Sequence, residues 1–347
     1  MSGGAIAQLV SRGEQDKYIT GSPDITFFNS NYKRHSNFSM FTQQQSFEGS
    51  VLAGRVSRVK FTKNGDLLGN MNLVVKENGQ TVLVQDWTKI IEYVELIIGG
   101  QVIDKQDSTF SEYLAVDLLA NSYSKSYPAS LHGGLGSKSF FYPFRFFFCD
   151  MWQSALPLVA LNYHDVELKI KWSEHLPSNQ QCFLTSTYIL LDDQERNSIA
   201  LKEHNMLIYQ VQKNPPSNER VHELVFNHPV KFIASSNAVA NNLVSRVNQV
   251  KIQVNGTDIE DYRNSIPYYS AIPCYYNTEF AALTSEGIFF YPFCLVANKY
   301  QPTGTLNFSR IDSCTLHCTE PINQPIYAVN YNVLKIKNGM AGVLFAD

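Results

Sequence analysis

Hydrophobic and polar residues alternate along much of this chain with the two-residue period of a β-strand. Segments such as "RVSRVKFTKN" (55–64), "RVNQVKIQVNG" (246–256) and "NYNVLKIKNG" (330–339) follow this pattern and end at Asn or Gly. Asn-Gly pairs, which favour tight hairpin turns, begin at positions 64, 78, 255 and 338. The pattern predicts an all-β protein with many short strands and turn-rich connections.

One segment near the middle of the chain has helical character instead. Residues 192–212, "DDQERNSIALKEHNMLIYQVQ", start at a capping Asp and place Ile199, Met206 and Leu207 among charged residues. The polar, proline-containing stretch "NPPSNER" follows directly. We expect a helix and a loop here that join two halves of the chain.

The two halves resemble each other in three places. The pentapeptide "FFYPF" occurs at 140–144 and at 289–293, and "VELIIGGQVIDK" (94–105) aligns with "VKIQVNGTDIED" (250–261). "PLVALNY" (157–163) aligns with "PTGTLNF" (302–308). The matches keep their order along the chain. The offset is 156 residues for the segments that begin at 94 and 250, 149 for the pentapeptides and 145 for the segments that begin at 157 and 302. They predict two copies of one all-β unit of roughly 150 residues, the size of an eight-stranded jelly roll.

The repeated pentapeptide also predicts local structure. Proline cannot donate a hydrogen bond to a sheet, so "FFYPF" belongs at a strand end or at a sheet edge. We expect its aromatic rings to pack between two sheets rather than to bind a ligand.

Composition narrows the class of protein. Hydrophobic residues make up 44% and charged residues 17%, which indicates a folded chain with extensive burial. A net charge of -3 gives no support for direct nucleic-acid binding through many phosphate contacts. No apolar run approaches the roughly 18 residues of a membrane helix, and the first residues lack a secretory signal. We therefore expect the chain to be made and kept in the cytosol or nucleus unless something else carries it out.

The cysteines predict reduced thiols. They lie at 149, 182, 274, 294, 314 and 318 without a CxxC pair. Cys314, Leu316 and Cys318 fall on one face of a strand, where the two thiols are too far apart for a disulfide.

Six blocks resemble the double jelly-roll major capsid proteins of nucleocytoplasmic large DNA viruses, and they lie in the family's order. They are "YITGSPDITFFNSNYKRHSNFSM" (18–40), "ALPLVALNYHDVELKI" (155–170), "YILLDDQER" (188–196), "LVFNHPVKFI" (224–233), "QPTGTLNFSRID" (301–312) and "IYAVNYNVLKIKNGMAGVLF" (326–345).

The resemblance implies two consecutive eight-stranded jelly rolls joined by a short helical linker, with short loops. The expected division is an N-terminal arm (1–25), a first jelly roll (26–197), a linker (198–217) and a second jelly roll (218–347). It also implies a virion protein made in the host cytoplasm, whose homotrimers are pseudo-hexagonal capsomers that tile an icosahedral shell.

Family members are commonly longer, because their loops rise as towers from the outer surface. Here the longest stretches without a strand pattern are 122–139 and 264–287. We expect a low outer surface, and the choice between the major subunit and a capsid paralogue with a minor role stays open. A jelly-roll carbohydrate-binding protein is the alternative from another class.

The residues that carry chemistry show no catalytic or metal-binding pattern. The eight histidines, at 35, 132, 164, 175, 204, 222, 228 and 317, form no HxH or HExxH motif. In "YHDVE" (163–167), His164 and Asp165 are adjacent and point to opposite faces of a strand, so with Glu167 they do not form a catalytic set. His222 and His228 are expected at the surface or at strand ends. We predict no enzyme activity, no cofactor, and no catalytic, cofactor-binding or metal site.

Two features bear on the partners of the chain. Ile6, Leu9 and Val10 predict a short amphipathic helical turn. The resemblance implies that this arm lies under the trimer, toward minor capsid or penton proteins or an inner membrane; a frayed terminus is the alternative. The sequons at Asn37, Asn255 and Asn307 are expected to carry no glycan.

Overall fold

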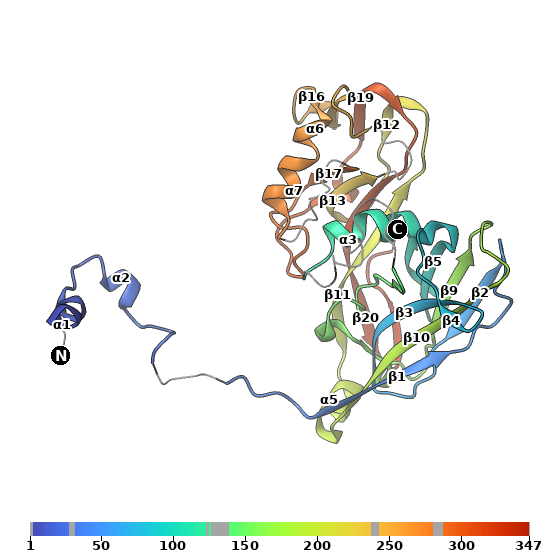
Figure 1. Cartoon of the computed structure of the whole chain (residues 1–347), viewed down its shortest axis with the longest axis horizontal. Coiled ribbons are helices and arrows are strands. Elements are labelled where there is room, and N and C mark those ends of the chain that lie inside the picture. Colours follow the sequence, from blue (N-terminus) through green and yellow to red (C-terminus); the bar gives the residue numbers. More distant parts are fainter. Residues whose placement is uncertain are drawn as a thin grey trace. The chain divides into compact units, whose positions relative to one another are not determined.

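The computed structural model describes residues 3–27, 32–122, 125, 139–236, 243–279 and 287–346. The chain divides into an N-terminal segment, Met1–Asn37, and a compact unit, Phe38–Asp347. The segment contains helices α1 (Gly3–Val10) and α2 (Lys17–Thr20) (Figure 1). Ile6, Leu9 and Val10 lie on α1 and are exposed, so the predicted helical turn is confirmed.

The first half of the compact unit contains two antiparallel sheets. The larger consists of β1 (Phe38–Gln45), β10 (Gln180–Leu191), β3 (Leu67–Glu77) and β4 (Gln80–Thr81), with β7 (Tyr142–Pro143) and β8 (Leu156–Pro157) also paired to β3. The smaller consists of β2 (Val56–Lys60), β9 (Val166–Trp172), β5 (Ile91–Ile98) and β6 (Gln101–Asp107).

The second half also contains two antiparallel sheets. The larger consists of β11 (His204–Asn214), β20 (Ile326–Lys337), β13 (Pro229–Ser236) and β17 (Ile288–Pro292), with β18 (Leu306–Asn307) on β13 and β21 (Met340–Val343) on β20. The smaller consists of β12 (Glu219–Glu223), β19 (Cys314–Ile322), β14 (Gln249–Val254) and β15 (Thr257–Asp258), with β16 (Arg263–Asn264) on β14.

The two halves arrange their strands in the same order. The larger sheets run β1-β10-β3-β7 and β11-β20-β13-β17, and the smaller ones run β2-β9-β5-β6 and β12-β19-β14-β15. Each half therefore has eight equivalent strands in two facing sheets, which is the jelly-roll arrangement. The predicted double jelly roll is confirmed.

The sequence repeat corresponds to equivalent strands, with one correction. Ile97 pairs with Val102 and Gln253 pairs with Asp258, which confirms the offset of 156 for the hairpins. "FFYPF" contributes β7 and β17 at an offset of 149. The third offset of 145 is wrong. Strands β8 and β18 both pair with the third strand of their roll, and their starts at 156 and 306 give an offset of 150.

The prolines of the pentapeptides lie on short strands beside β3 and β13, as predicted. The aromatic residues follow the prediction only in part. Tyr142, Phe144, Phe289 and Phe290 are buried, whereas Phe140 and Phe141 are exposed.

The predicted central helix is too long. Helix α5 spans Asp193–Leu201, and β11 begins three residues later, within the expected linker 198–217. Eleven residues of β11 pair with β20 in unbroken register. This pairing determines the conformation of Met206 and Leu207 more strongly than the helical spacing of their neighbours. The bounds of the linker and the two rolls stay a prediction.

Helical segments follow β6 in the first roll and β16 in the second. The π-helical turn η2 (Phe110–Leu114) continues into α3 (Ala115–Leu118). Helices α6 (Ser265–Tyr268) and α7 (Ala271–Asn277) occupy part of the stretch 264–287 that was expected to be irregular, so that expectation is wrong there. In the other expected irregular stretch, 123, 124 and 126–138 lie outside the described residues. Short 3-10 turns complete the fold: η1 (Trp87–Lys89), η3 (Trp152–Ser154), η4 (Leu158–Ala160) and η6 (Phe308–Arg310).

The buried apolar residues form three clusters. One fills the first roll and extends to Ile208, Leu334 and Ile336 of the second roll's long strands. Another fills the second roll. The third, which we call the junction core, joins η2 and α3 of the first roll to β13, β17 and β20 of the second. Figure 1 accordingly draws α3 between the strands of the two rolls.

Candidate functional site

The side chains of the sequence "YHDVE" make separate structural contacts. His164 Nδ1 lies 3.0 Å from the backbone nitrogen of Ala341. Asp165 forms an ion pair with Lys60 at 2.6 Å, which lowers the pKa of its carboxyl group, and Glu167 lies 3.8 Å from Arg58. The structure therefore does not bring these three side chains together as a catalytic set.

The other singled-out polar residues also support local structure. His222 lies near the end of β12, one of the two expected positions, but it is buried, and its ring nitrogens contact Ser217 Oγ and the Glu219 carbonyl at 3.0 and 2.9 Å. Burial lowers its pKa. The Asn255 amide oxygen accepts hydrogen bonds from the backbone of Asp312 and Ser313. These contacts give both residues a structural role.

The thiols are structural as well. All six cysteines are free, and Cys314, Leu316 and Cys318 point into the core of the second roll. Burial raises the pKa of the Cys318 thiol to about 12. Among the described residues, no group of three or more His, Cys, Asp or Glu side chains could hold a metal ion, and no helix is long and apolar enough to cross a membrane.

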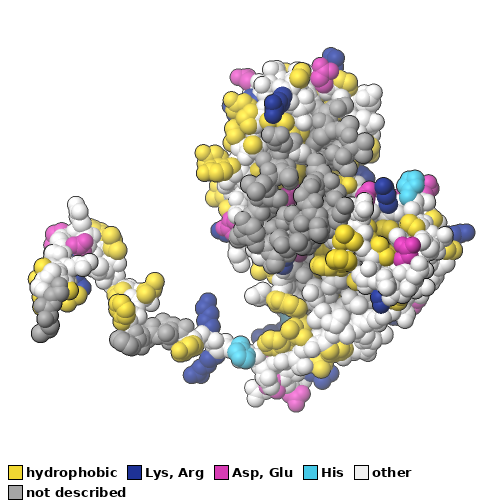
Figure 2. Space-filling model, in the orientation of Figure 1, with side chains coloured by type: hydrophobic (Ala, Val, Ile, Leu, Met, Phe, Trp, Pro, Cys, Tyr) yellow, Lys and Arg dark blue, Asp and Glu magenta, His cyan; other side chains and the backbone are white. Residues whose placement is uncertain are grey.

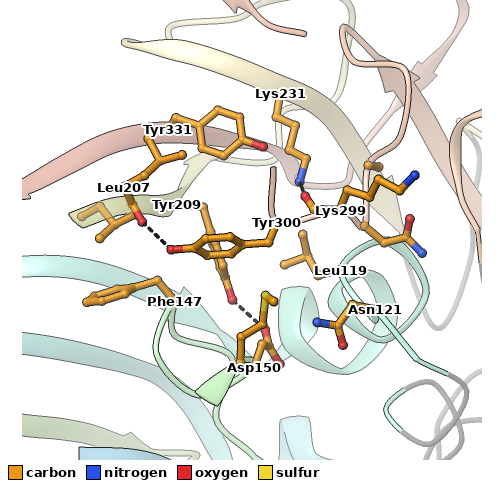
Figure 3. A pocket seen from close by; sticks show the side chains of 14 residues that line it. Leu119, Asn121, Phe147, Asp150, Leu207, Tyr209, Lys231, Lys299, Tyr300 and Tyr331 are labelled. Carbon is orange, nitrogen blue, oxygen red and sulfur yellow. Dashed lines mark hydrogen bonds between the residues drawn. The ribbon is translucent and has the colours of Figure 1, made fainter. Parts of the chain in front are cut away.

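The most unusual polar environments lie where the two jelly rolls meet. Tyr209 on β11 donates a hydrogen bond across the junction to Asp150 Oδ2 at 2.7 Å (Figure 3). The buried guanidinium of Arg145 lies 3.2 Å from the other oxygen of Asp150. Burial raises the pKa of the Tyr209 hydroxyl, so this group remains a donor. A residue of the second roll is thus fixed to a charged pair of the first.

Two carboxylates of β6 hold the same strand. Asp104 Oδ1 accepts a hydrogen bond from the Val211 backbone at 2.9 Å, and burial raises the pKa of Asp104 to about 7. Asp107 Oδ2 accepts from Lys213 at 2.6 Å and from the Tyr327 hydroxyl at 2.7 Å. Strand β6 of the first roll is therefore linked to strand β11 of the second roll.

The space between Tyr209, Lys231 and Tyr300 at the junction is small. The cavity drawn in Figure 3 has a volume of about 30 Å³, which holds one or two waters. Beside it Tyr300 donates a hydrogen bond to the Leu207 carbonyl at 3.2 Å, and Lys231 donates to the Lys299 carbonyl at 3.1 Å. Burial lowers the pKa of Lys231 to about 8. This arrangement suits a rigid structural joint rather than a ligand site.

Strand β1 and helix α7 are among the elements that carry exposed apolar residues. Phe38 and Met40 on β1 are about half exposed, at 51% and 48%. Tyr275 and Tyr276 on α7 are 78% and 72% exposed. Figure 2 shows hydrophobic side chains at the edge of the molecule where Figure 1 places α6 and α7. Exposed apolar surfaces of this kind are able to support a role in assembly.

Sequence reasoning did not find the junction. Asp104 lies in the predicted strand-turn-strand segment 94–105 and Tyr209 in the expected linker 198–217, whereas Asp107 lies outside both. A usable signal was the pair of acidic residues in "QVIDKQD", since carboxylates three apart in a strand reach different partners. The partners themselves lie more than 100 positions away along the chain, beyond any local pattern.

Known proteins match the chain over most of its length. The family model for the major capsid protein N-terminus matches residues 26–209, and that for the large eukaryotic DNA virus major capsid protein matches 232–342. The major capsid protein of Pyramimonas orientalis virus is 32% identical, with 99% of this chain and 100% of that protein covered. The major capsid protein of Paramecium bursaria Chlorella virus 1 is 29% identical over 439 positions, with the same coverage.

Solved structures agree with these matches. PBCV-1 VP54 superposes with a TM-score of 0.76 at 25% identity, covering 93% of this chain and 100% of that one. The Faustovirus major capsid protein has the same fold, with a TM-score of 0.65 at 12% identity and 96% of each chain covered. This chain, a double jelly roll, therefore belongs to the family of large eukaryotic DNA virus major capsid proteins.

Proposed function

We propose that the chain is a structural subunit of a virion, and that its homotrimers are pseudo-hexagonal capsomers of an icosahedral shell. The observation that carries this proposal is the equivalent strand order of the two rolls. Three chains would present six similar β units, so one trimer would fit where a hexagonal lattice has six neighbours.

The junction supports the same proposal. A ring of six units closes only if the two rolls of each chain keep a fixed relative orientation. Phe110 and Leu114 are fully buried against the second roll, and polar contacts of Asp104, Asp107 and Tyr209 link β11 to the first roll. Satisfied buried polar groups specify one arrangement where apolar packing alone tolerates several.

The N-terminal segment belongs to a further part of the proposal. Its exposed α1 would contact minor capsid or penton proteins or an inner membrane, through Ile6, Leu9 and Val10. The subunit would be made in the host cytoplasm, act without a cofactor or catalytic site, and make no direct sequence-specific contact with nucleic acid.

Electron microscopy of the purified full chain tests the capsomer geometry. We expect class averages with three-fold symmetry and a hexagonal outline, and sheets or shells of such particles at high concentration. Particles of single subunits, or a symmetry other than three-fold, would contradict the proposal.

A further inference from the structure

The structure contains one interface between jelly rolls, and it indicates where a second must form. Within the chain, the residues that follow β6 of the first roll are covered by the second roll. Phe110, Leu114 and Leu118 of this η2–α3 segment each have an exposed fraction of 0%. They pack on the sheet that begins with β11.

In the part of the chain that the structure describes, no other roll covers the equivalent segment of the second roll. The hairpin offset of 156 maps Phe110 to Ile266 and Leu118 to Cys274, within the α6–α7 segment. One side of α7 packs inward through the buried Cys274. The other side exposes Tyr275 and Tyr276, with the neighbouring Tyr268 and Ile272 exposed to 45% and 40%. We call these four residues the α7 face.

The equivalent of β11 is β1, which has no such cover among the described residues of the compact unit. Strand β11 is linked to β6 of the other roll through Asp104 and Asp107, whereas β1 is exposed at Phe38 and Met40. These two residues lie two apart and share one side of the strand. Trp152 is 53% exposed. Its ring and the side chain of Ile189, which pairs with Met40, both lie within 4 Å of the point where a Cβ atom added to Gly69 would be. Trp152 therefore lies on the same side of the sheet as Met40. We call Phe38, Met40 and Trp152 the β1 face.

We propose that the α7 face of one copy docks on the β1 face of the next copy. This inference rests on the proposed homotrimer and assigns its contact surfaces. Each chain has one face of each kind, so the contact is head-to-tail, and three copies close a ring with no face left over. The intermolecular contact would then repeat the intramolecular one, with α6–α7 in the place of η2–α3 and β1 in the place of β11.

The chemistry of the two faces suits this partner. Neither β1 (FSMFTQQQ) nor α7 (AIPCYYN) contains a charged residue. The α7 face is rich in tyrosine, and Arg263 lies 5.4 Å above the ring of Tyr268 at its border. An aromatic, uncharged centre with a cation at the rim is typical of a stable protein interface.

Two surface variants test the assignment by light scattering after size exclusion. One carries Tyr275→Asp and Tyr276→Asp, and the other carries Met40→Asp. All three residues are exposed, so both variants should keep the wild-type circular dichroism spectrum. We expect each variant alone to have the mass of one chain. Leu201→Asp, at a position with 87% exposure outside both faces, should remain trimeric.

Mixing the two variants tests the head-to-tail arrangement. Each retains the face that the other has lost, so an equimolar mixture should form a dimer with twice the chain mass of 39.3 kDa. Trimers of either variant alone, or a mixture that stays monomeric at high concentration, would overturn the assignment. A wild-type chain that is itself monomeric would instead overturn the proposed trimer.

Discussion

At the scale of single residues, the structure assigns the strongest constraints to polar groups at the junction of the rolls. Tyr209 is the clearest case, because its hydroxyl contacts Asp150 at 2.7 Å and the Arg145 carbonyl at 3.2 Å. Its ring also belongs to the apolar packing around the junction core. The ring of Tyr209 therefore contributes packing and its hydroxyl contributes hydrogen bonds, and a substitution can separate the two contributions.

Tyr209→Phe should keep the packing and remove the hydrogen bond. We expect the free energy of unfolding to fall by about 1–3 kcal/mol, because Asp150 loses a buried donor. Urea denaturation at constant protein concentration measures this change. Tyr163→Phe, at a position with 79% exposure, is the matched control and should change stability by less than about 0.5 kcal/mol. Equal effects of the two substitutions would contradict the proposed role of the hydroxyl.

Asp104 should make stability depend on pH. Burial raises its pKa from 3.8 to about 7, so the native state binds this proton more tightly than the unfolded chain. Its contribution to the free energy of unfolding is therefore full below about pH 4 and is lost as the pH rises toward 7. The loss has a limit of about 1.4 kcal/mol per pH unit.

Asp104→Asn tests this dependence. We expect the variant to lose less stability than the wild type between pH 5 and 7, as measured by urea denaturation at each pH. Glu112, whose pKa is raised to about 8 by burial, contributes to both proteins alike. Asp258→Asn is the matched control, because it makes the same substitution at a partly exposed carboxylate away from the junction. A parallel curve for Asp104→Asn would show that its carboxyl group does not titrate in this window.

At the scale of elements, η2 and α3 form the main apolar contact of the first roll with the second. Leu114 is fully buried in the junction core between elements of both rolls. Removing three of its side-chain carbons should leave a cavity that rigid strands on either side cannot fill.

Leu114→Ala should therefore cost about 2–5 kcal/mol of unfolding free energy. Thermal and urea unfolding measure the loss, and Leu201→Ala, at a residue exposed to 87%, is the control with little expected effect. A loss below about 1 kcal/mol for Leu114→Ala would mean that the junction core contributes little to holding the rolls together.

Local sequence predicted the elements well where the pattern is local. Alternating segments gave strands β2, β14 and β20, and Asn-Gly pairs close the hairpins at Asn255 and Asn338, both with positive φ. The prediction failed where pairing with a distant strand determines the secondary structure. Residues 204–212 were expected to be helical, but β20, more than a hundred positions later, makes them a strand. The helical turns at 110–118 were missed because their residues are buried on all sides and show no amphipathic pattern.

At the scale of the whole molecule, the repeat in the sequence corresponds to a repeat of the fold. The hairpin and "FFYPF" matches have the predicted offsets, so two equivalent rolls could be inferred from the sequence. The contacts of the junction could not be inferred, because their partners lie far apart along the chain and the repeat does not mark them. At the offset of 156, Asp104 aligns with Glu260 but Asp107 aligns with Arg263.

The N-terminal segment should be separable from trimer formation. It forms a unit of its own, Met1–Asn37, with exposed helices. Deleting residues 2–15 should leave the mass of the soluble oligomer unchanged and reduce the yield of closed shells, or the binding to vesicles and to minor capsid proteins. Light scattering and electron microscopy measure the two effects. Unchanged oligomers and unchanged shells would remove the proposed role of the arm.

The central claim is that the double jelly roll is a unit of self-association, and the solution mass of the purified full chain tests it most directly. Size exclusion with light scattering should give three times the chain mass of 39.3 kDa, stable on dilution, as an extensive closed interface requires. A well-folded monomer at all concentrations would contradict the account.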